Sequence, residues 1–205
     1  MRDFRFLTCV SCALAALLVL PAQAADWRID PAHSSAGFSV THMMVSTVRG
    51  TFDRMTGSIQ YDPAEPEKAS LSIEIDTASV NTRNQRRDDH LRSADFFDAE
   101  KFPKMTFVST KVERAGEGRL KLTGNLTIRD VTKTVTFELE GPAKPLVTER
   151  GMRTGASATT KINRKDFGLM WNRLIEGGGV TVGDEVAITI DVELTEVRPR
   201  PGQGG

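Results

Sequence analysis

Apolar and polar residues alternate along most of this chain with a period of two. Such alternation is typical of β-strands that bury one face and expose the other. The clearest run is LSIEID over residues 71–76, in which every second side chain is apolar. The pattern recurs in residues 120–128, 135–139 and 186–194, and more weakly in residues 38–40, 105–107 and 156–162. Together with residues 48–61 these runs indicate about eight strands, which predicts an all-β barrel or sandwich.

The apolar positions change parity within residues 48–61. Phe52 and the apolar residues before it share one parity, whereas Met55 and those after it share the other. A strand changes its buried face only by taking up an extra residue, so we expect a bulge between Asp53 and Gly57. Bulges let a sheet curve, which favours a closed barrel.

Two long segments, residues 81–103 and 163–179, break the alternation. Both are too long for simple turns, and both combine mixed charge with bulky apolar side chains. Loops of this length that carry apolar groups usually pack back on the domain. We therefore expect short helical segments that cover the mouth of the barrel.

The first 24 residues have the three parts of a secretory signal peptide. Arg2 and Arg5 precede an apolar run over residues 10–20, and Ala22-Gln23-Ala24 follows as a small-residue cleavage site. The run is short for a bilayer span. We expect export to the periplasm and no stable membrane insertion after cleavage. The mature chain would be one domain over residues 25–197 with a disordered tail over residues 198–205.

Cleavage would also remove both cysteines, Cys9 and Cys12, which excludes disulfides and thiol chemistry from the mature chain. The whole chain has 27 basic and 27 acidic residues and a formal net charge of +0, with both signs interspersed. Proteins that bind nucleic acids usually show a basic excess, so we expect no nucleic-acid partner.

The histidines and carboxylates form no recognisable catalytic or metal motif. His33 and His42 are nine residues apart, so a continuous strand would place them on opposite faces. No close pair of histidines is present to anchor zinc. The serines near glycines lie outside a Gly-x-Ser-x-Gly elbow, and adjacent acids such as Asp88 and Asp89 are usually solvated. We expect no catalytic residue, no metal and no cofactor.

Five motifs follow one another along nearly the whole mature chain: WRIDPAHS (residues 27–34), RDDHLRSADFFD (87–98), GNLTIR (124–129), INRKDFG (162–168) and VGDEV (182–186). In this order they resemble the YceI family of bacterial lipid- or polyisoprenoid-binding proteins. The resemblance implies an extended, lipocalin-like antiparallel barrel that holds an isoprenoid or another long-chain lipid in an apolar pore. It also implies export to the periplasm and no catalysis, and it leaves a homodimer open.

The alternation and the resemblance together predict ligand contacts. Inward apolar side chains would line the barrel, apolar side chains of the long loops would close its mouth, and polar groups there would meet a headgroup. The predicted lining residues are Phe38, Val40, Phe52, Ile73, Phe107, Leu126 and Phe137; the mouth residues are Leu91, Phe96, Phe97, Phe167 and Trp171; the headgroup residues are Arg87, Asp88 and His90.

Two other functions stay open at this point. Alternation identifies a buried face without showing whether that face borders a cavity. A filled barrel that acts through its surface, as an envelope stress or interaction protein, therefore fits the same pattern. An enzyme acting on a lipid in the pore is the third possibility, and changes at His90 or Asp88 would test it.

Overall fold

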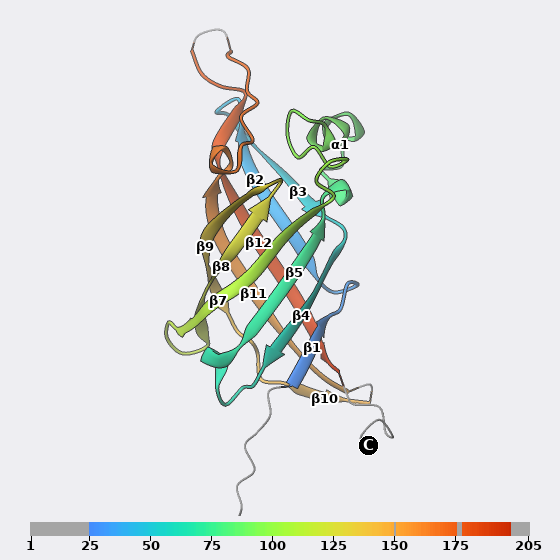
Figure 1. Ribbon diagram of the computed structural model, residues 1–205, viewed down its shortest axis with the longest axis vertical. Helices are drawn as coiled ribbons and strands as arrows, with labels where there is room; N and C mark the ends of the chain where they lie inside the picture. The colour runs from blue at the N-terminus through green and yellow to red at the C-terminus, as the bar shows by residue number, and fades with distance from the viewer. Residues whose placement is uncertain (1–24, 150, 176–177, 198–205) are drawn as a thin grey trace, which may run out of the picture.

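The computed structural model describes residues 25–149, 151–175 and 178–197 of the chain (Figure 1). The predicted signal peptide and the predicted C-terminal tail lie outside the described residues. The strands are β1 (Ala25–Ile29), β2 (Ser35–His42), β3 (Ser46–Phe52), β4 (Met55–Tyr61), β5 (Ser70–Asp76), β6 (Val80–Asn81), β7 (Lys104–Arg114), β8 (Arg119–Ile128), β9 (Val131–Glu140), β10 (Leu146–Thr148), β11 (Gly151–Asn163) and β12 (Val182–Glu196). The helical elements are α1 (Gln85–Arg92) and the 3-10 turns η1 (Pro66–Lys68), η2 (Thr77–Ser79) and η3 (Arg164–Phe167).

Eight strands close into an antiparallel barrel. Their order is β11-β9-β8-β7-β5-β4-β1-β12, and β12 pairs with β11 to complete the ring. Closure satisfies backbone groups that an open sheet would leave unpaired at its edges. The predicted fold, an all-β antiparallel barrel of about eight strands, is confirmed.

The shorter strands lengthen the barrel wall at one end. β1 and β2 pair with successive parts of β12, and β3 then pairs with β2 and β6 with β3. β6 has no second strand partner among the described residues. Helix α1 follows β6 in the chain and packs against it on this open side, at the upper end of the barrel in Figure 1.

The predicted change of buried face occurs at Asp53–Arg54, between β3 and β4. Phe52 and Met55 are both buried although they are three positions apart, which a regular strand does not allow. The neighbouring strand is interrupted at the same level by η2, and the Asp53 N–H donates to the Ser79 carbonyl oxygen over 3.1 Å. The predicted change of buried face is therefore confirmed, but β3 ends at Phe52 and β4 begins at Met55, so it takes the form of a break between two strands and not of a one-residue bulge.

Each long loop contains a short helical segment, as predicted: α1 lies in the first and η3 in the second. No helix in the described part of the chain is long and apolar enough to cross a membrane.

Candidate functional site

An apolar cavity occupies the interior of the barrel. Its volume is about 390 Å³, within the range usual for sites that enclose a small ligand. Inward side chains from most strands line it, together with side chains of both long loops. The described barrel is therefore hollow and not filled by its own side chains.

Most of the predicted site residues lie at this cavity. Phe167 and Asp88 are the two that do not line it. Direct contact with a ligand stays a prediction for all of them. The predicted residues that line the cavity are Phe38, Val40, Phe52, Ile73, Arg87, His90, Leu91, Phe96, Phe97, Phe107, Leu126, Phe137 and Trp171.

Gly124 makes room for the aromatic side chains in the middle of the barrel. The rings of Phe107 and Phe137 meet edge to face, with their centroids 5.2 Å apart. A Cβ atom at Gly124 would lie 2.4 Å from Cζ of Phe107 and 2.5 Å from the Val108 carbonyl oxygen. A side chain at this inward position would force the Phe107 ring or the backbone at Val108 to move. The lack of a side chain at Gly124 therefore determines where the Phe107 ring lies inside the barrel.

An aromatic cluster at the mouth joins the two long loops. The ring of His90, on α1, lies edge-on to Phe96 and to Trp171, with centroid distances of 5.0 and 4.8 Å. Phe96 and Trp171 also contact each other at 5.2 Å. His90 Nε2 lies 2.9 Å from a carboxylate oxygen of Asp95, which orients the imidazole. The mouth is thus bounded by residues about 80 positions apart in sequence.

A second aromatic group continues from the mouth into the barrel. The ring of Phe52 contacts Phe38 at 5.6 Å and Phe97 at 5.5 Å. Phe38 and Phe52 belong to the strands β2 and β3, whereas Phe97 belongs to the loop after α1. The loop therefore packs directly on the cavity wall, as the sequence predicted for its apolar residues.

Asp88 holds α1 in place and does not face the cavity. It is buried, and its Oδ1 accepts hydrogen bonds from the backbone N–H of Thr82 (2.8 Å) and from the Thr82 hydroxyl (2.5 Å). A buried carboxylate needs such donors to offset its desolvation. Asp88 therefore does not line the cavity as predicted, because both donors come from the segment that precedes the helix.

Arg87 reaches the same segment but also lines the cavity. Its Nε and Nη2 donate to the hydroxyl and the carbonyl oxygen of Thr82, over 2.7 and 2.9 Å. A guanidinium has five N–H donors. Three donors of Arg87 have no acceptor among the described residues, so they remain able to meet a polar group at the mouth.

Arg164 is the central residue that sequence reasoning did not single out. It is 4% exposed, and burial lowers the pKa of its guanidinium, although nearby Asp184 opposes that shift. Asp184 accepts one of its hydrogen bonds, at 3.1 Å. All five of its N–H donors are used, so this arginine ties the second long loop to β12. The other four acceptors are the carbonyl oxygens of Leu169, Trp171, Val182 and Gly183.

Phe167, predicted at the mouth, lies in the barrel wall and does not line the cavity. β9 and β11 pair only over three residues, Ser157–Thr159 with Glu138–Glu140, and diverge beyond them. Turn η3, which ends at Phe167, packs against β9 and β11 at this divergence. Phe167 is 1% exposed there. The residue fills a gap in the barrel wall because the two strands no longer meet.

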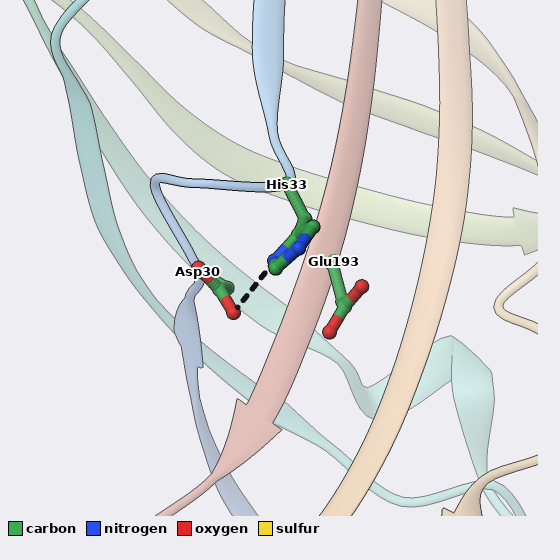
Figure 2. Close-up of side chains that lie close together, drawn as sticks. All are labelled: Asp30, His33 and Glu193. Carbon is green, nitrogen blue, oxygen red and sulfur yellow. Dashed lines mark hydrogen bonds and ion pairs between the residues drawn. The ribbon is translucent and has the colours of Figure 1, made fainter.

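Asp30, His33 and Glu193 cluster outside the cavity, at the interruption between β1 and β2 (Figure 2). Their potential ligand atoms lie within 4.8 Å of one another, as in a metal site. Arg153 already supplies a cation, however: its Nη1 lies 3.1 Å from Asp30 Oδ2 and also contacts Glu193. The pKa of Asp30 is lowered, chiefly by its hydrogen bond with His33. The cluster is therefore a completed ion-pair network.

Comparisons with known proteins all lead to the same protein family. The sequence model of the family described as YceI-like domain matches residues 27–194. A UPF0312 protein of Vibrio cholerae is 38% identical over 166 residues, which cover 79% of this chain and 88% of the relative. Proteins with that level of identity over most of both chains share a fold.

Solved structures show the same architecture. The YCEI protein of Campylobacter jejuni superposes with a TM-score of 0.67 at 35% identity, covering 78% of this chain and 90% of that protein. A polyisoprenoid-binding domain of Saccharophagus degradans gives a TM-score of 0.61 at 14% identity, covering 85% and 99%. The second likeness is one of fold alone.

Proposed function

Because the chain belongs to the family of YceI-like domains and its barrel is hollow, we propose that it binds a long-chain apolar lipid, such as a polyisoprenoid, inside the barrel. The single observation that carries the proposal is the cavity, which is lined almost wholly by apolar side chains. The S. degradans domain, described as polyisoprenoid-binding, supports the same ligand class through its shared fold.

The energetics favour an apolar chain over a compact polar ligand. Each buried methylene contributes about 0.8 kcal/mol, so ten methylenes give roughly 8 kcal/mol before the cost of immobilising the chain. The lining offers few groups that would fix a polar ligand. Affinity would therefore rest on apolar length.

A headgroup would lie at the mouth, beside Arg87 and His90. Arg87 has unused donors there, and His90 presents its ring at the cavity surface. A hydroxyl or phosphate on the lipid would accept from the guanidinium, which forms strong charge-assisted hydrogen bonds. These two residues would then set the orientation of the lipid, with its tail in the barrel.

The composition of the cavity wall supports binding without catalysis. No carboxylate, serine, cysteine or lysine lines the cavity among the described residues. Serine, cysteine and lysine supply most catalytic nucleophiles, so the histidines that line the cavity, His42 and His90, have no such nucleophile beside them on its wall to activate. Together with the signal-peptide pattern of residues 1–24, this supports a periplasmic carrier or store for the lipid.

Extraction and mass spectrometry test the proposal. The purified chain, extracted with organic solvent, should release about one lipid per chain, and stripped protein should take up a polyisoprenoid alcohol. Release of no lipid, with no uptake afterwards, would contradict it.

A cavity-filling variant makes the test specific to the interior. Ala158 on β11 lines the cavity, so Ala158→Trp should abolish uptake without burying a charge. Val108→Trp is the matched control, because Val108 is exposed on the outer face of β7. Circular dichroism checks that both variants fold. Equal uptake by the two variants would place the lipid outside the barrel.

A further inference from the structure

Large apolar side chains are exposed around the mouth of the barrel. Met44, Val45 and Leu174 are 68%, 85% and 82% exposed. Met43, next to Met44, and Met170, four residues before Leu174, are also exposed. Single exposed apolar residues are ordinary, but a group of them at one end marks a contact surface. These five residues form the mouth patch.

Two segments that project from the same end of the barrel carry the mouth patch (Figure 1). Met43–Val45 form the turn between β2 and β3, and Leu174 belongs to the excursion between η3 and β12. The Met43 N–H donates to the Thr181 carbonyl oxygen over 2.9 Å, which joins the two segments. A Cβ at Gly179 would lie 3.0 Å from Met44 Sδ, so the methionine packs against the excursion.

The turn between β2 and β3 has a backbone that methionine does not favour. The Val45 N–H donates to the His42 carbonyl oxygen, and both central residues have positive φ, 50° at Met43 and 60° at Met44. Tight hairpin turns of this kind strongly prefer Asn and Gly. Two successive methionines at these positions therefore lower the stability of the folded chain. This indicates that their side chains have a role other than stabilising the turn.

The mouth patch is continuous with the cavity. His42 and Thr181, which flank the two projecting segments, both line the cavity. Leu169 and Trp171, on either side of Met170, line it as well. The residues that adjoin the mouth patch in sequence therefore belong to the cavity wall themselves.

We propose that the mouth patch inserts into the surface of a lipid bilayer and that lipid enters and leaves the barrel there. This inference rests on the proposed function, since a bilayer is the phase in which a long-chain lipid is stored. Flexible methionine and leucine side chains suit the boundary between headgroups and acyl chains. Arg83 and Arg86, exposed at the start of α1 on the same end, add attraction to anionic headgroups.

Vesicle flotation tests the docking surface. The chain from Ala25 onward contains every described strand, so it is mixed with vesicles of phosphatidylcholine and phosphatidylglycerol. The variant carries Met43→Asn and Met44→Gly, residues that this turn prefers, so its melting temperature should stay equal or rise. Its affinity for vesicles should nevertheless fall about tenfold, through loss of apolar side chains that insert.

A matched control lies at the other end of the barrel. Leu146 and Val147 on β10 are about as exposed as the mouth patch, and β10 lies at the lower end in Figure 1. Leu146→Ser with Val147→Ser should leave vesicle binding unchanged. Equal loss in both variants, or no flotation of the unmodified protein, would overturn the docking proposal.

Loading from solution separates this proposal from the proposed function. A polyisoprenoid alcohol delivered from ethanol, without vesicles, should load both variants to the level of the unmodified protein. Transfer of the same alcohol from vesicles should slow only in the turn variant. Vesicle binding without any loading would contradict the proposed function and leave the docking surface supported.

Discussion

Arg153 carries the positive charge that lets two carboxylates meet at the interruption between β1 and β2. Asp30 and Glu193 both contact it, and the hydrogen bond with His33 is the main cause of the lowered pKa of Asp30. Arg153→Met should leave the carboxylates without their cation and lower the melting temperature at pH 7. Lys161→Met is the control, because the Lys161–Glu185 pair is exposed on both sides and contributes about 1 kcal/mol or less.

The pH dependence follows from the direction of the Asp30 shift. A carboxylate whose pKa is lower in the folded chain than its unfolded value of about 3.9 stabilises the fold above that pH. This contribution is lost as the pH falls through the folded-state pKa. The gap in melting temperature between Arg153→Met and the unmodified protein should therefore narrow in acid. A gap that stayed constant from pH 7 to pH 3 would show that Arg153 acts by packing alone.

Single residues differ in how far the sequence predicts them. Inward phenylalanines such as Phe107 follow from alternation, because a strand of known parity fixes the face of each side chain. Arg164 does not, since four of its five acceptors are backbone carbonyl oxygens, two of them in an irregular loop that has no period. The burial of Asp88 does not follow from the sequence for a related reason: composition cannot distinguish a solvated acid from one buried against Thr82.

Elements were predictable where the alternation is uninterrupted. The sequence places strands at 71–76, 120–128, 135–139 and 186–194, and each lies within an observed strand. β7 is longer than predicted because its register shifts between Ser109 and Lys111, which changes the parity of later residues. β1 was not predicted, because a five-residue strand offers too few alternating positions.

Helix α1 is held to the barrel by arginine side chains more than by an apolar face. Arg92 Nε and Nη2 donate to the carbonyl oxygens of Ala78 and Val80, over 2.9 and 3.0 Å. Arg92→Ala should therefore cost about 1–3 kcal/mol locally and speed amide exchange in residues 82–98. Release of a bound lipid should also become faster, with the barrel strands unchanged. Arg86→Ala on the exposed face of the same helix is the control, and equal effects of both changes would contradict the proposed anchoring.

At the scale of the whole molecule, the length of the barrel wall determines how much apolar cavity the barrel can enclose. Strands β2, β3 and β6 extend the wall past the closed ring, and helix α1 packs against this extension at β6. A closed barrel with such a wall encloses a long cavity without leaving unpaired backbone inside it. The cavity shape then sets a maximum chain length for the ligand.

That maximum length predicts how affinity depends on the ligand. For a series of linear alcohols, each added methylene should tighten binding about fourfold, the equivalent of about 0.8 kcal/mol, until the chain fills the barrel. Beyond that length the affinity should level off, because further methylenes remain in water. Displacement of a fluorescent lipid measures the series, and in Leu122→Trp, which narrows the cavity from β8, the plateau should begin at a shorter chain. If affinity kept rising with length in both proteins, the alcohols would be binding along an outer surface, since only an enclosed site limits the length that it shields.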